Sequence, residues 1–186
     1  MDKIKEHDHS HYDSFVCCIL SHGKEGHIHG SDSVAVPLDT ITTLLNGDSC
    51  KTLVGKPKIF LMQACRGTQR DRGVRVDGDE EEIEAKPHII VSDSDVRVES
   101  DSDIPDVADF FFGYATPPGH VAWRDLDNGS WYISELCRSL VSNARSSNLE
   151  TILKIAGRKV GEEYETGGFK QAPEITSRLT KDVFFF

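Results

Sequence analysis

The stretch IFLMQACRG at residues 59–67 begins with an apolar run and ends with the polar and reactive residues Gln63, Cys65 and Arg66. The segment Lys58–Ala64 has the length of a β-strand, and an apolar run without alternation is typical of a strand covered on both faces of a sheet. A similar run, SFVCCIL at residues 14–20, ends abruptly at SHG. We therefore expect two central strands, each followed at once by polar residues.

The segment between these two runs predicts a helix over residues 38–46, because its leucines and isoleucine recur with helical spacing. A strand, a helix and a strand in this order form a unit whose two strands are parallel. Phe110–Ala115 predicts a third strand.

Two further helices are predicted towards the C-terminus. The first has an apolar stripe of Ile133, Leu136, Cys137, Leu140, Val141 and Ala144. The second follows a capping-box pattern of Ser147 and Glu150, and its stripe is Leu149, Ile152, Leu153, Ala156 and Val160. Lys181–Phe186, KDVFFF, predicts a last strand. These elements together predict an α/β fold with a mostly parallel central sheet and helices on both of its faces.

The composition is ordinary for a soluble globular protein, with 38% hydrophobic and 28% charged residues, and no apolar run is long enough to span a membrane. The net charge of −10 is concentrated between Asp77 and Asp109, so the rest of the chain has no basic excess that would favour nucleic-acid binding. The five cysteines are odd in number and lack paired spacing. They predict free thiols in a reducing compartment, which means the cytosol or the nucleus, and we expect a cytoplasmic protein.

His22 and Cys65 each come just after the predicted end of a strand, where sites form in open α/β sheets. A thiol becomes a strong nucleophile when a nearby imidazole favours its thiolate. Gly23 would let a backbone N–H approach closely, as an oxyanion hole requires. From the residues alone, an inert buried thiol beside a structural histidine stays open as an alternative.

Five segments of the chain resemble caspases: QACRG at 63–67, SHGKEG at 21–26, VADFFFGYATPPG at 107–119, AWRDLDNGSWYISELC at 122–137 and RLTKDVFFF at 178–186. The resemblance covers nearly the whole chain except the acidic stretch. It implies the three-layer caspase fold and a cysteine endopeptidase that cleaves proteins after aspartate in programmed cell death. It also implies that Cys65 is the nucleophile and His22 the general acid and base, with the N–H groups of Cys65 and Gly23 holding the oxyanion.

The resemblance further implies that Arg124 and Gln63 bind the substrate aspartate, while Arg66 has no role in substrate binding. Trp123 and Trp131 would shape the second and fourth subsites, with a simple core role for Trp131 as the less favoured alternative. Val121 stands where executioner caspases have a tyrosine, which should widen the second subsite. Asp125 and the short turn at 164–174 should make the fourth subsite more open and less favourable to acidic groups.

The family matures by cleavage between a large and a small subunit, which here implies parts at residues 1–77 and 102–186 and an acidic linker at 78–101. VRVD before Gly78 and VESD before Ser102 make Asp77 and Asp101 the expected processing sites, with Asp95 and Asp103 poorer ones. Caspases pair through the last strand of the sheet, so a homodimer joined at Val183–Phe186 is expected. Activating caspases or inhibitors are further partners that the family implies.

Three alternatives remain open. The strand, helix and loop that begin a caspase domain have no match here, nor has the second arginine of the aspartate pocket, so the chain is a fragment or its pocket is incomplete. A non-catalytic caspase-like protein that pairs with active caspases is a second possible function. Metal binding by His7, His9 and His11, or by His22, His27 and His29 with Cys17 and Cys18, matches no structural zinc spacing, so neither metal nor cofactor is expected.

Overall fold

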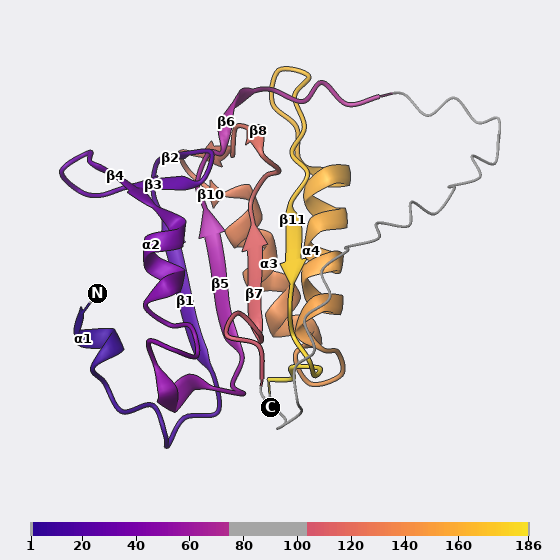
Figure 1. Ribbon diagram of the computed structural model, residues 1–186. Helices are drawn as coiled ribbons and strands as arrows, with labels where there is room; N and C mark the ends of the chain where they lie inside the picture. The colour runs from indigo at the N-terminus through magenta and orange to yellow at the C-terminus, as the bar shows by residue number, and fades with distance from the viewer. Residues whose placement is uncertain (1, 75–103, 186) are drawn as a thin grey trace, which may run out of the picture. The chain divides into compact units, whose positions relative to one another are not determined.

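A four-stranded sheet in the order β1-β5-β7-β11 forms the centre of the computed structural model, which describes residues 2–74 and 104–185 (Figure 1). Its strands are β1 (Phe15–Leu20), β5 (Lys58–Gln63), β7 (Phe110–Tyr114) and β11 (Glu174–Ser177). The first three are parallel to one another, and β11 is antiparallel to β7. The predicted α/β class with a mostly parallel sheet is therefore confirmed.

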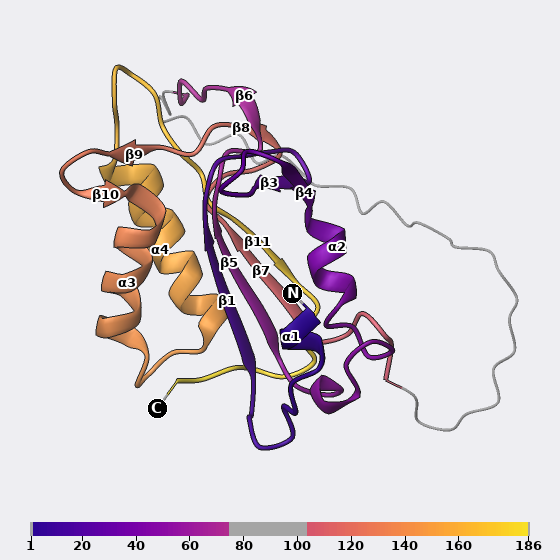
Figure 2. The ribbon, with the colours of Figure 1, turned by 90° about the vertical axis from the view of Figure 1, so that its left-hand side faces the viewer.

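Helices cover both faces of this sheet. The short α1 (Asp2–Lys5) and α2 (Leu38–Thr43) lie on one side, and α3 (Trp131–Asn143) and α4 (Leu149–Glu163) lie on the other (Figure 2). Strand β5 is buried at every position because its side chains alternate between two cores. Ile59 and Leu61 belong to the core under α3 and α4, while Phe60 and Met62 belong to the core under α2.

Short elements gather beyond the carboxyl ends of the parallel strands, at the upper edge of the sheet in Figure 1. Strands β2 (Gly23–Lys24), β3 (His27–His29) and β4 (Ala35–Pro37) form a small antiparallel sheet, β6 (Gly67–Gln69) pairs with β8 (Gly119–His120), and β9 (Arg124–Asp125) pairs with β10 (Gly129–Ser130). A 3₁₀-helix, η1 (Lys51–Leu53), precedes β5 at the opposite edge. The loops that carry the candidate site residues therefore lie together at one edge of the sheet.

Strand β1 differs from the prediction of full burial. Its residues alternate between half-buried and exposed, with Val16 47% and Leu20 59% exposed. The half-buried residues Phe15, Cys17 and Ile19 pack against the core under α2. Strand β1 is less buried than β5 because it lies at the edge of the sheet, where within the described residues it pairs with β5 alone.

The predicted last strand at residues 181–186 is wrong. The fourth strand is β11, while Val183 and Phe185 pack against the core under α3 and α4. The carbonyl oxygen of Val183 accepts a hydrogen bond of 2.8 Å from the N–H of Leu149, the first residue of α4. The apolar residues of this segment are therefore used to dock the chain against the start of a helix instead of extending the sheet. Phe186 lies outside the described residues.

The predicted helices exist, although α2 ends at Thr43 and not at residue 46. Two details of the C-terminal helices were also predicted wrongly. The cap of α4 is Asn148 and not Ser147, since the Asn148 side chain accepts a hydrogen bond of 2.9 Å from the N–H of Thr151. In α3 the predicted stripe is rotated, so that Cys137 and Val141 are exposed while Glu135 and Ser139 are buried. The cause is a polar contact with α4, where Lys159 pairs with the buried Glu135 at 3.0 Å.

Asn148→Ala should lower the free energy of unfolding by about 1 kcal/mol, because the first turn of α4 loses its side-chain acceptor. Ser147→Ala is the matched control and should change it by less than about 0.5 kcal/mol. Urea unfolding followed by circular dichroism measures both. Equal losses in the two variants would show that Asn148 is not the cap that stabilises α4.

Candidate active site

The register of two parallel strands sets the positions of His22 and Cys65. Leu20 of β1 pairs with Gln63 of β5, and the N–H of Ser21 donates to the carbonyl of Gln63 at 3.0 Å. His22 and Cys65 each follow this paired level by two residues. The structure therefore brings the two predicted catalytic residues to the same edge of the sheet, on neighbouring strands.

Gly23 lies against the backbone of Cys65. A Cβ atom added at Gly23 would be 2.9 Å from the carbonyl oxygen of Cys65 and 2.8 Å from that of His27, closer than real Cβ atoms approach. Glycine is therefore required here by the close contact between two backbone segments. The backbone of His22 is fixed as well, because its carbonyl accepts a hydrogen bond of 2.9 Å from the N–H of His29.

The thiol of Cys65 is half-buried and contacts the backbone of a segment from the other part of the chain. The N–H of Ala122 donates to Sγ at 3.4 Å, and Sγ lies 3.8 Å from the carbonyl oxygen of Ala122. The imidazole of His22 is exposed, and within the described residues it makes no side-chain hydrogen bond, including to Cys65. In this conformation the thiol is therefore partnered by residue 122 and not by the histidine.

Gln63 and Trp123 leave polar atoms buried without partners. The Nε2 of Gln63 is 3.5 Å from the carbonyl oxygen of Trp123, the limit for a hydrogen bond. The Oε1 of Gln63 and the Nε1 of Trp123 have no hydrogen-bond partner among the described residues. Buried polar atoms without partners are costly, so this region favours either a rearrangement or a bound group that supplies the missing partners.

Arg124 lies on the surface of the described structure. It begins the two-residue strand β9, its side chain is exposed, and it forms neither an ion pair nor a side-chain hydrogen bond with the part of the chain that the structure describes. The predicted binding of a substrate carboxylate by Arg124 and Gln63 therefore stays a prediction.

Aromatic rings stack beside this site. Trp123 stacks on Trp131 and on Phe169, with 5.9 Å between ring centroids in both pairs. The guanidinium of Arg70 lies 5.6 Å from the ring of Trp123 and 5.4 Å from that of Phe169. The two tryptophans Trp123 and Trp131 are therefore brought together, and Trp131 is buried. The role of Trp131 in a subsite stays a prediction.

Three contributors to this arrangement were missed by sequence reasoning: Phe169, Arg70 and Gln171. The buried Gln171 accepts from the N–H of Trp123 at 2.6 Å and donates to the carbonyl of Ala115 at 2.9 Å. No periodicity marks these residues in the sequence. The family resemblance could have pointed to the turn at residues 164–174, which contains two of them.

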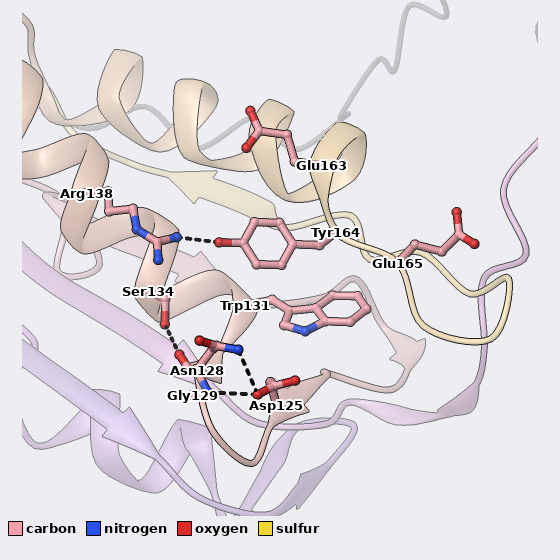
Figure 3. A pocket seen from close by; sticks show the side chains of 9 residues that line it. All are labelled: Asp125, Asn128, Gly129, Trp131, Ser134, Arg138, Glu163, Tyr164 and Glu165. Atoms are coloured by element: carbon pink, nitrogen blue, oxygen red, sulfur yellow. Dashed lines mark hydrogen bonds between the residues drawn. The ribbon is translucent and has the colours of Figure 1, made fainter.

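A pocket of about 260 Å³ adjoins Trp131 (Figure 3). Its lining is Asp125, Asn128, Gly129, Trp131, Ser134, Arg138, Glu163, Tyr164 and Glu165. Tyr164 is held by the guanidinium of Arg138, which donates to its hydroxyl at 2.6 Å. Hydrogen bonds from the N–H groups of Asn128 and Asp127 lower the pKa of Asp125, which keeps this carboxylate ionised. Val121 lies apart from this pocket, and its N–H donates to the carbonyl of Gln69 at 2.9 Å.

Arg66 serves the structure. Its guanidinium pairs with Glu174 of β11, donates to the carbonyl of Thr116 at 3.2 Å and lies 3.9 Å from the ring centroid of Tyr114. Arg66, the residue after Cys65, is therefore anchored to β11, the last strand of the sheet.

All five cysteines are unpaired. Among residues 2–74 and 104–185, no three His, Cys, Asp or Glu side chains are grouped so as to hold a metal ion, and no helix is long and apolar enough to cross a membrane. Asp77 and Asp101 lie outside the described residues.

Comparison with known proteins gives a consistent family. A family model described as the caspase domain matches residues 1–184. The chain is 44% identical over 188 residues to caspase-3 of Xenopus laevis, of which it covers 61%. It is 40% identical to caspase-3 of Mus musculus over 194 residues and of Bos taurus over 192 residues, covering 64% of each, and each alignment includes the whole of this chain. The chain thus spans 61% to 64% of the length of these relatives.

Glu174→Gln should lower the free energy of unfolding by about 1–3 kcal/mol, because it leaves the largely buried Arg66 without its carboxylate. Glu162→Gln removes an exposed pair with Arg158 and should cost less than about 0.5 kcal/mol. Urea unfolding of both variants provides the comparison. A loss for Glu174→Gln no larger than for the control would contradict the structural role of Arg66.

Proposed function

Because the chain belongs to the caspase domain family, we propose that it supplies the catalytic machinery of a cysteine endopeptidase that cleaves proteins after aspartate in programmed cell death. The observation that carries this proposal is the strand register, which sets His22 and Cys65 at one level of neighbouring parallel strands. A cysteine and a histidine in such a position suit nucleophilic catalysis, in which the imidazole takes the thiol proton.

The proposed reaction uses groups that lie within one edge of the sheet. The sulfur of Cys65 attacks the backbone carbonyl carbon of the substrate aspartate, and the N–H groups of Cys65 and Gly23 stabilise the oxyanion. Protonated His22 then donates its proton to the leaving amine, and water hydrolyses the acyl-enzyme. Because the Ala122 N–H now contacts the thiol, substrate binding has to move this segment away from Sγ.

The proposed aspartate pocket consists of Gln63 and Arg124, once the exposed guanidinium turns towards the buried amide. The substrate carboxylate would accept charge-assisted hydrogen bonds from the Arg124 guanidinium and from Nε2 of Gln63, and the guanidinium would also donate to the unpartnered Oε1 of Gln63. Val121 and Trp123 would bound the second subsite. The pocket beside Trp131 would be the fourth, and the ionised Asp125 would disfavour an acidic side chain there.

Cys65→Ala should abolish cleavage of aspartate peptides while leaving the urea unfolding curve of the protein unchanged. His22→Ala should reduce kcat by a factor of about 10² or more, since both proton transfers use this imidazole. Covalent labelling with a peptide that ends in an aspartate aldehyde checks the same assignment without turnover. A parent protein that takes up no label would instead support a non-catalytic partner of active caspases.

Arg124→Ala should lower kcat/KM for aspartate peptides by roughly 10²-fold or more, because a paired charge in the pocket is lost. The variant is compared with the parent on matched peptides that end in Asp or Asn at the cleaved position. Arg145→Ala is the control for loss of a surface charge and should leave the ratio unchanged. Equal preference for Asp in Arg124→Ala and in the parent would remove Arg124 from the pocket.

We propose maturation by cleavage after Asp77 and Asp101, which would separate a part with His22 and Cys65 from a part with Arg124 and Trp131. We also propose that the protein is cytoplasmic and pairs as a homodimer. The edge strand β11, which pairs with β7 alone among the described residues, replaces the wrongly predicted strand at Val183–Phe186 as the joining surface. Activating caspases and inhibitors are the proposed further partners, with no cofactor required.

Incubation with an active caspase, followed by mass spectrometry of the intact fragments, tests the processing sites. We expect fragments ending at Asp77 and Asp101, and their loss in Asp77→Ala and Asp101→Ala. The variants Asp95→Ala and Asp103→Ala are controls whose cleavage should match the parent. An uncut chain, or cuts elsewhere, would refute these sites.

A further inference from the structure

Arg70 lies beside both residues that bound the proposed second subsite. Its Cζ atom is 5.6 Å from the ring centroid of Trp123 and 5.4 Å from that of Phe169, which stacks on Trp123. The carbonyl of the preceding residue, Gln69, accepts a hydrogen bond of 2.9 Å from the N–H of Val121. The guanidinium therefore contacts one side of the subsite, and the backbone that carries it is attached to the other.

The backbone on either side of Arg70 fixes this position. Strand β6 ends at Gln69 and pairs with β8, and the carbonyl of Asp71 accepts a hydrogen bond of 2.9 Å from the N–H of Lys170. Lys170 follows Phe169 directly in the chain. Residue 70 is therefore held between the strand that leads to the subsite and the turn that carries Phe169, and stacking on two rings further restricts its guanidinium.

Arg70 and its neighbour Arg72 have no carboxylate partner. Neither forms an ion pair within the described residues, and the Cζ atom of Arg72 is 5.9 Å from the ring centroid of Phe169. Carboxylates of the adjoining segments are engaged elsewhere, since Asp71 accepts a hydrogen bond of 2.8 Å from a backbone N–H of its own turn and Glu165 pairs with a lysine at 3.8 Å. Two cationic groups without an anion therefore adjoin the subsite, in a chain whose net charge is −10.

The ring of Trp123 carries a further donor without an acceptor. Its Nε1 is buried and has no hydrogen-bond partner in the described part of the chain. An indole N–H and a guanidinium can only donate hydrogen bonds, so what both groups lack is an acceptor. An acidic side chain brings acceptor oxygens and a negative charge to this subsite, whereas an apolar side chain brings neither.

We propose that Arg70 is a specificity-determining residue that selects glutamate immediately before the aspartate at which the substrate is cut. The guanidinium would pair with the glutamate carboxylate through charge-assisted hydrogen bonds, and Arg72 would add to the positive potential there. The inference rests on the proposed protease function, because it assigns an acidic class of substrate to the second subsite of that enzyme.

Three peptides that differ only in the residue before the cleaved aspartate, which is Glu, Gln or Val, test this assignment through kcat/KM. We expect the parent to prefer Glu over Gln by about three- to tenfold at low salt, and the preference to shrink as salt screens the pair. Arg70→Gln should bring the Glu-to-Gln ratio to about one, and Arg70→Lys should keep part of it, since the charge remains. Arg145→Gln, which removes an exposed arginine beyond the end of α3, is the matched control and should leave the ratio unchanged.

An unchanged ratio in Arg70→Gln, with all three peptides cleaved more slowly, would overturn the proposal, because Arg70 would then only support the stacked rings. Equal cleavage of the Glu and Gln peptides by the parent would overturn it as well.

Binding without turnover separates this inference from the proposed protease function. Fluorescence anisotropy of the same peptides, labelled, with Cys65→Ala and with Cys65→Ala combined with Arg70→Gln measures the ratio of the Kd values for Glu and Gln. A Glu preference that depends on Arg70, in a parent that cleaves none of the peptides, would remove the protease function and keep the inference. Cleavage without a preference would do the reverse, and peptides that are neither cut nor bound would contradict both.

Discussion

The parallel pairing of β5 with β1 and β7 is the constraint on which the candidate site depends. Leu20 pairs in register with Gln63, and Met62 pairs in register with Tyr114. The loops that follow the three strands therefore begin at the same edge of the sheet. Strand β5 is held in this register by two cores, since a slip of one residue would exchange the side chains facing α2 with those facing α3 and α4. The position of Cys65 is therefore determined by packing far from the thiol itself.

Buried charges in the scaffold are paired, whereas uncharged polar atoms are left without partners at the site and at the Tyr132 hydroxyl in the core. In the scaffold, buried charges such as Glu135 and Lys58 have partners, in Lys159 and in backbone carbonyls respectively. At the site, Gln63 and Trp123 each leave a buried polar atom unpaired, while Ala122 contacts the thiol. In the loop after β7, aromatic rings are well stacked but some buried polar atoms lack hydrogen-bond partners. This is expected of a segment whose missing partners are supplied by a bound chain.

The pattern of apolar residues along the chain correctly predicted those helices and strands whose own residues determine what they pack against. The apolar run at 58–64 and the stripe of α4 gave correct elements, and the strand ends led to His22 and Cys65. Contacts between distant segments could not be predicted in this way. Val183 docks against Leu149 instead of joining the sheet, and Arg70 and Phe169 meet only through the fold. The edge position of β1 was missed because an apolar run does not reveal how many neighbours a strand has.

The pairing of β5 with β7 has a further consequence, since it joins residues that precede and follow the segment 75–103. The interface between these two stretches is the interior of the sheet and its two cores, where Ile59 and Leu61 pack with Phe111 and Tyr132. Covalent continuity between them contributes little to this burial. Expressed as separate polypeptides, each would display an apolar face that the other completes, so they would behave as an obligate heterodimer recovered by fragment complementation and not as two independent folding units.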